Sequence, residues 1–246
     1  VRTPKPANRS FEGVTTFRGN ESRSYYGRGP VPLDPVVRWQ HPERPTLCSE
    51  SIVGIDSSRW CGTGWTGQPN VIALAGGGVE VREGAYDGQS HCVDGDTGAA
   101  PLVTLDLAKG SATTDPNGFP LYYAGSRDGH LRVVALDRDE PETLWSIDGG
   151  TSVPRPLRND DWDGAPLIVK DHLLEGGENG WFYVIRLHRG YDDDGLVTVD
   201  PDVRAPCQFP LLAVVHGLDR IAELGARARF HFHERDERIA LNDDVD

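Results

Sequence analysis

A short pattern that recurs three times along the chain is the feature that most constrains its fold. Each copy has a Gly, two further residues, Asp or Asn, a second Gly, and then alternating apolar positions. The copies are residues 84–94, 125–137 and 176–187. Asp-Gly and Asn-Gly supply the positive φ values of a two-residue primed turn, and the alternation is typical of a half-buried strand. The pattern therefore predicts three β-hairpins of one kind.

A second marker precedes each hairpin, a strand opener that begins at Gly67, Gly110 or Gly164. The hairpin glycines are 41 and then 51 residues apart, and the openers are 43 and then 54 apart. Because the two series drift together, the segments are true repeats, with an insertion at about residues 149–163. A repeat of about 40–45 residues has the size of a four-stranded propeller blade. We therefore expect an all-β propeller with three clear blades and a partial first one.

Residues 135–145 resemble the signature of quinoprotein (PQQ-like) repeats. The signature is Ala, any residue, Asp, two residues, Thr-Gly, Lys or Glu, two residues, and Trp. The matching residues are Ala135, Asp137, Glu142 and Trp145, whereas Glu140-Pro141 replaces Thr-Gly. The preceding blade carries the complementary half of the signature, Asp94, Thr97 and Gly98. In this family the tryptophan docks between neighbouring blades. The resemblance therefore implies that the four matching residues of the segment 135–145 form a structural latch.

The resemblance covers about residues 15–200 and divides the chain into three parts. Residues 1–14 are expected to be an N-terminal tether, residues 15–204 the repeat propeller, and residues 205–246 a tail without the repeat. The tail holds only two of the 29 glycines and mixes apolar with charged residues, so it is expected to be irregular or partly helical. A propeller has about 4–8 blades. The chain is therefore a small closed ring, an incomplete ring, or a protein whose tail is not authentic family sequence.

Charge and hydropathy exclude two classes of partner. The formal net charge of −13 argues against nucleic acid, which is bound by concentrated Lys and Arg. No run of 18 apolar residues occurs, so no membrane span is expected. Binding is instead expected at blade loops, to a protein or a small molecule, and the oligomeric state stays open.

Four cysteines and the first residues point to an oxidising compartment. Cys48 and Cys61 flank a polar loop and are candidates for a disulfide, whereas pairing of Cys92 with Cys207 stays open. The chain has no Met, and its first six residues read like a tether left after removal of a signal or anchor. We expect a secreted or cell-envelope protein.

The insertion supplies the preferred ligand-facing loop, with Asp160, Asp161, Trp162 and Asp163. In the alternative interpretation, the tryptophan packs between blades and the acids cap turns.

A second acidic group, Asp192, Asp194 and Asp200, suits the oxygen coordination of Ca²⁺, or is an exposed turn. His231 and His233 lie on one side of a possible strand and could bind a metal, although a solvated tail explains them as well.

The leading function is a non-catalytic binding or scaffolding propeller outside the cytoplasm, as in non-enzymatic relatives of the repeat. The alternative is a quinoprotein oxidoreductase that depends on pyrroloquinoline quinone and Ca²⁺. Such enzymes hold the quinone with a disulfide between adjacent cysteines, which this chain lacks. The Gly-x-Ser-x-Gly and phosphate-loop motifs are also missing. We therefore expect no cofactor and no pyrroloquinoline quinone, while Ca²⁺ stays possible.

Overall fold

The fold is all-β throughout the described residues of a computed structural model. The structure describes residues 5–25, 27, 29–42, 46–53, 56–63, 67–99, 103–105, 110–154, 156, 160–203, 207–208, 229–232 and 239–242. The chain splits into two compact units, Val1–Cys207 and Gln208–Asp246. Helical structure in the described part is limited to one 3₁₀ turn, η1 (Phe17–Gly19). No helix in the described residues is long and apolar enough to cross a membrane.

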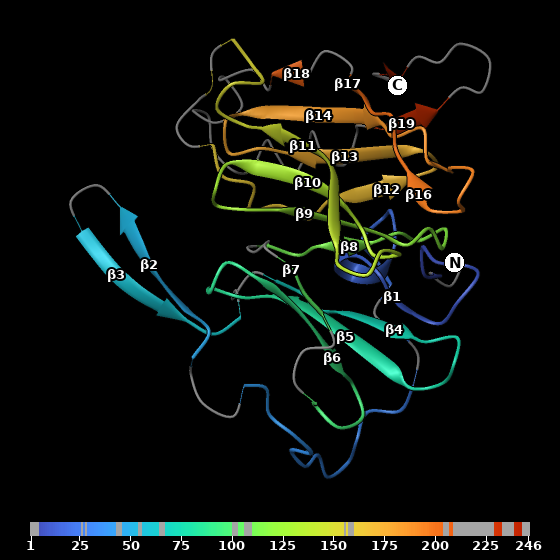
Figure 1. Ribbon diagram of the computed structural model, residues 1–246. Coiled ribbons are helices and arrows are strands. Elements are labelled where there is room, and N and C mark those ends of the chain that lie inside the picture. The colour runs from blue at the N-terminus through green and yellow to red at the C-terminus, as the bar shows by residue number, and fades with distance from the viewer. Residues whose placement is uncertain are drawn as a thin grey trace. The chain divides into compact units, whose positions relative to one another are not determined.

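Three antiparallel sheets make up most of the first unit (Figure 1). The first has the order β1 (Gly13–Val14), β4 (Asn70–Ala73), β5 (Val79–Gly84), β6 (Ser90–Asp94) and β7 (Val103–Leu105). The second has β8 (Thr113–Thr114), β9 (Leu121–Gly125), β10 (His130–Ala135) and β11 (Glu142–Asp148). The third has β12 (Leu167–Val169), β13 (His172–Gly176), β14 (Trp181–Arg186) and β17 (Asp202–Val203). Each sheet thus contains a four-stranded meander, and none of the described sheets closes on itself.

All three predicted hairpins are present, but their turns differ from the expected type. Ser126 N–H donates to His130 O, so the loop between them has three residues, and the other two hairpins have the equivalent bond. Only the loop glycine has positive φ: Gly88 +85°, Gly129 +80° and Gly180 +83°. The prediction of two-residue primed turns was therefore wrong. A three-residue loop that ends on a left-handed glycine takes its place.

The Asp or Asn of each hairpin has a role that does not require positive φ. Its Oδ1 accepts the backbone N–H two residues later, at 3.1 Å in all three copies. The donors are Gln89, His130 and Trp181. This is an Asx turn, which fixes the chain direction just before the next strand. The same local bond in three places supports the internal repeat.

The first strands of the three sheets meet through polar contacts. Asn70 Nδ2 donates to Ala112 O at 2.9 Å, and Asn70 Oδ1 accepts the N–H of Thr114 at 2.8 Å. Thr113 Oγ1 lies 2.5 Å from Pro166 O and 3.0 Å from Thr16 Oγ1. The three openers predicted from the sequence therefore lie side by side.

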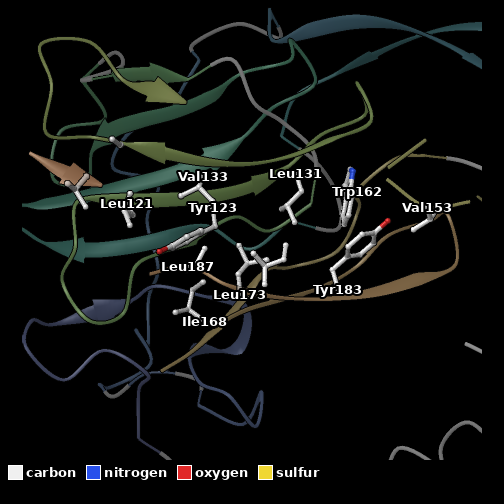
Figure 2. Packing of buried hydrophobic residues seen from close by; sticks show 13 residues of the cluster. Leu121, Tyr123, Leu131, Val133, Val153, Trp162, Ile168, Leu173, Tyr183 and Leu187 are labelled. Atoms are coloured by element: carbon white, nitrogen blue, oxygen red, sulfur yellow. The ribbon is translucent and has the colours of Figure 1, made fainter. Parts of the chain in front are cut away.

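The main core lies between the second and third sheets (Figure 2). β9 is buried on both faces, because Leu121 and Tyr123 point toward the third sheet while Tyr122 and Ala124 join a separate cluster. Tyr122 also contacts the first sheet, where Arg82 lies 5.9 Å from its ring centroid. The second sheet is thus the middle layer of three.

A disulfide between Cys48 and Cys61 confirms the predicted pairing. It joins the first and last residues of an antiparallel hairpin, β2 (Cys48–Val53) and β3 (Asp56–Cys61). The hairpin base is bonded to the first repeat, since Tyr86 N–H donates to Gly62 O at 2.9 Å. Cys92 is a free, buried thiol, so it does not form a disulfide with Cys207.

The described N-terminal residues contact the rest of the first unit: Ala7 and Asn8 are buried, and β1 pairs with β4. In the described residues of the tail, β19 (Arg229–Phe232) pairs with β20 (Ile239–Asn242). In β19, apolar and polar residues alternate with the period of two that is typical of a strand. The stretch expected to be partly helical, residues 211–228, lies outside the described residues, and β18 (Cys207–Gln208) marks the boundary between the units.

Candidate binding site

A pocket of about 740 Å³ lies between residues 38–42 and the turn at residues 97–99. Trp39 forms its fixed side. The indole Nε1 donates to Gly95 O at 3.0 Å. A Cβ on Gly98 would lie 2.5 Å from the Trp39 ring, so only glycine allows the indole to approach this closely.

The turn opposite Trp39 is built by the Asp94, Thr97 and Gly98 half of the repeat signature. Asp94 Oδ1 accepts the Thr97 hydroxyl and the Thr97 N–H, both at 2.7 Å. These bonds, the hydroxyl first, lower the pKa of Asp94. Gly98 closes the turn with a φ of +68°. The signature residues thus form a rigid platform against which the indole packs.

Two imidazoles lie beside the pocket. The rings of His41 and His91 have centroids 5.7 Å apart, and His91 Nε2 lies 2.9 Å from Asp87 Oδ2. Glu83 is the cross-strand neighbour of His91. Within the described part of the chain, His41 Nε2, His91 Nδ1 and Glu83 Oε2 are buried without a hydrogen-bond partner.

Burial sets the charge of these groups. Desolvation, and then the proximity of His91, lowers the pKa of His41. Desolvation raises the pKa of Glu83 to about 7. His41 is therefore neutral at pH 7, and Glu83 is near half-protonation there.

A second buried polar cluster lies near the first strands of the sheets. The Arg23 guanidinium donates to Thr16 Oγ1 at 2.8 Å and to Ala165 O at 2.7 Å. Glu175 is 4% exposed, and burial raises its pKa to about 8 although Arg23 opposes that shift. Gly164 is required here, because a Cβ at that position would overlap Glu175 Oε1 at 1.9 Å. The cluster joins the N-terminal segment to the third sheet.

The predicted ligand-facing loop is largely part of the core. Trp162 is completely buried between the second and third sheets, where its ring lies 4.8 Å from that of Tyr183 (Figure 2). Its Nε1 donates to Gly129 O at 2.8 Å. Asp161 is also buried and lies 3.3 Å from Arg127 Nε. Trp162 and Asp161 are thus used in packing, as in the alternative interpretation of this loop. Asp160 is exposed and Asp163 is half-buried.

The predicted latch residues lie where the second sheet meets the third. Ala135 is buried in the main core, and Trp145 is half-buried against it. Asp137 Oδ2 accepts the N–H of Val197 at 2.6 Å, and Glu142 accepts from Arg138 at 2.9 Å. The tryptophan thus lies between neighbouring sheets, and its role as a latch stays a prediction.

The acidic group expected to suit Ca²⁺ is a hairpin turn between β15 (Gly190–Tyr191) and β16 (Val197–Thr198). Asp192 Oδ1 accepts the N–H of Asp194 at 3.0 Å and that of Leu196 at 2.8 Å, while Gly195 has a φ of +80°. Asp194 and Asp200 are exposed. Across the described residues, no group of three His, Cys, Asp or Glu is arranged to hold a metal ion. His231 lies in β19 with its side chain undescribed, and His233 is outside the described residues.

Sequence reasoning missed the imidazole pair and the Arg23–Glu175 cluster. His91 lies inside the first repeat copy, and no pattern in the sequence places it next to His41. Sequence reasoning also missed the buried ion pair of Arg189 with Asp115 at 2.5 Å, for which the sequence offers no pattern.

The chain matches no family model and no curated protein.

Proposed function

We propose that this chain is a non-catalytic binding or scaffolding module built of quinoprotein-like propeller blades and working outside the cytoplasm. The observation that carries this proposal is that four side chains singled out in the sequence hold strands or turns in place instead of facing a ligand. Trp162, Asp161, Asp137 and Asp192 all make intramolecular contacts that position strands or turns. The surface left for function is the pocket beside Trp39 and the loops between strands.

The propeller architecture is supported by the two tryptophans at sheet boundaries. Trp39 packs on the Asp94–Gly98 turn of the first sheet, and Trp145 packs against the core between the second and third sheets. This agrees with the docking role that the resemblance implies. Three stacked four-stranded meanders whose first strands meet are the arrangement expected of consecutive blades.

An extracytoplasmic location is supported by the disulfide of the β2–β3 hairpin. A disulfide persists in oxidising compartments and is rare in the cytosol. The free Cys92 does not argue against this, because it is buried, and burial raises the pKa of its thiol to about 12. A protonated thiol reacts slowly.

Reconstitution distinguishes the proposal from the quinoprotein alternative. The purified protein would be incubated with pyrroloquinoline quinone and Ca²⁺, desalted, and examined by absorption spectroscopy and by dye-linked oxidation of ethanol. We expect no retained chromophore and no turnover. A stoichiometric chromophore with alcohol-dependent dye reduction would contradict the proposal and establish the oxidoreductase.

A further inference from the structure

Residues 31–39 have the sequence pattern of a strand with one apolar face. The odd positions are all apolar: Val31, Leu33, Pro35, Val37 and Trp39. The even positions between them are Pro32, Asp34, Val36 and Arg38, so both charged residues of the segment lie on that side. A wholly apolar side opposite a side that carries all the charges is typical of a half-buried strand.

In the structure this segment is unpaired and exposed. Residues 29–42, all within the described part of the chain, belong to no strand and make no backbone–backbone hydrogen bond. Val31 is 84% exposed, Leu33 103%, Val36 75% and Val37 86%. An apolar segment with free backbone donors and acceptors is a template for pairing with another strand.

The segment is fixed at its C-terminal end. Trp39 donates a hydrogen bond to Gly95 O and packs on Gly98. Two residues further along the chain, the ring of His41 contacts that of His91. Fixing one end lowers the entropy lost when the segment binds, so it is partly preorganised.

An equivalent segment elsewhere in the chain shows what this pattern does when a partner is present. Pro35 precedes Trp39 by four residues, as Pro141 precedes Trp145. The second of these segments forms β11, which pairs antiparallel with β10 and places its tryptophan against the neighbouring sheet. The first has its tryptophan in place but no strand beside it.

We propose that two copies of this chain associate by antiparallel pairing of residues 33–39 about a two-fold axis at Val36. This interaction surface shares Arg38 and Trp39 with the pocket, but the pairing of two copies does not depend on a ligand in the pocket. In this register Asp34 of one copy lies opposite Arg38 of the other, and the pair occurs twice.

Three constraints select the register. Pairing must keep odd positions opposite odd positions, because a shift by one residue would mix the apolar and polar faces. Pro35 has no N–H and must occupy a non-hydrogen-bonded pair, here opposite Val37. A two-fold axis at Asp34 would oppose two carboxylates, and an axis at Pro35 or Val37 would leave both charges unmatched. Only the axis at Val36 gives two opposite-charge pairs.

Charge exchange between copies tests the register directly. Asp34→Arg gives copies in which Arg faces Arg, and Arg38→Asp gives copies in which Asp faces Asp. Each variant alone should stay monomeric in sedimentation velocity at concentrations where the unmodified chain dimerises. An equimolar mixture of the two variants should form heterodimers, because every facing pair is again opposite in charge. The double variant D34R/R38D should dimerise like the unmodified chain.

Two proline variants test the backbone pairing. Val36→Pro removes an N–H from a hydrogen-bonded pair and should abolish dimerisation. Val37→Pro removes an N–H that the register leaves unpaired and should weaken it less. Circular dichroism melting of every variant establishes that it is folded. A chain that is monomeric up to millimolar concentration, or single-charge variants whose mixture fails to associate, overturns the proposal.

Discussion

Burial makes the charge of Glu175 depend on the folded state. Its pKa is raised to about 8 in the fold, whereas an unfolded carboxyl titrates near its ordinary value of 4.5. Between these values the unfolded chain releases a proton that the folded chain keeps. Stability should therefore fall as pH rises from about 4.5 to 8.

Glu175→Gln removes this ionisation and should flatten the decline. The melting temperature of the variant should change less between pH 5 and pH 8 than that of the unmodified chain. Glu21→Gln, at an exposed position, is the matched control and should leave the decline intact. If the unmodified chain is instead stabilised by rising pH, the Coulombic attraction of Arg23 outweighs desolvation of Glu175, and the prediction is wrong.

Trp162 is the residue whose truncation should affect stability most. It is completely buried, contacts Tyr183 and donates a hydrogen bond to Gly129 O. Trp162→Ala should lower the free energy of unfolding by about 3–5 kcal/mol, because it leaves a cavity in the main core. Urea denaturation measures the change. Leu33→Ala, at a side chain exposed to solvent, should change the monomer's stability by less than about 0.5 kcal/mol.

Hairpin elements depend on the left-handed glycine. Gly88 has a φ of +85° with open space around its Cα, so the effect of a side chain there is purely conformational. Gly88→Ala should lower the free energy of unfolding by about 1–2 kcal/mol. Gly76→Ala, also in open space but at an ordinary φ, should be close to neutral. Equal losses from the two substitutions would show that the turn conformation is not what glycine provides.

The hairpins also show what sequence can predict about an element. The Gly-x-x-Asp/Asn-Gly spacing located all three turns, because loop glycines and Asx caps act locally. It did not distinguish a two-residue from a three-residue loop, since both use Asp-Gly or Asn-Gly and differ only in which residues pair across the strands. Pairing depends on the partner strand, which the local pattern does not contain.

The β2–β3 hairpin should depend on its disulfide. It is a two-stranded sheet, which is marginal in isolation, and the disulfide closes a segment with a sequence separation of 13. Cross-links of this size contribute about 3 kcal/mol. In the double variant C48S/C61S, amide exchange in β2 and β3 should become fast while β9 and β10 keep their protection. Cys92→Ala controls for loss of a thiol, and slow exchange retained in the hairpin would contradict the prediction.

For the whole molecule, the stacking of sheets was less predictable than the sheets themselves. The repeat indicated meanders in the correct order, because hairpins connect neighbouring strands. It left two interpretations of Trp162 open, a ligand-facing side chain and a side chain packed between blades, and only the structure shows that Trp162 fills the space between two sheets. The repeat also did not indicate that Glu175 and Arg23, 152 positions apart, would share a buried cluster. Contacts of this kind depend on how the sheets stack, and a sequence repeat does not specify the stacking of sheets.

The net charge of −13 makes association of two copies depend on salt in a characteristic way. Two such molecules repel over a range that shrinks from about 30 Å at 0.01 M salt to about 8 Å at 0.15 M. In the proposed dimer the Asp34 and Arg38 side chains face each other at short range, and the burial of Val37 and Leu33 is not electrostatic. Dimerisation should therefore strengthen as salt rises through this range, as measured by sedimentation equilibrium. Steady weakening with salt would mean that surface ion pairs alone hold the copies together, without the apolar strand face.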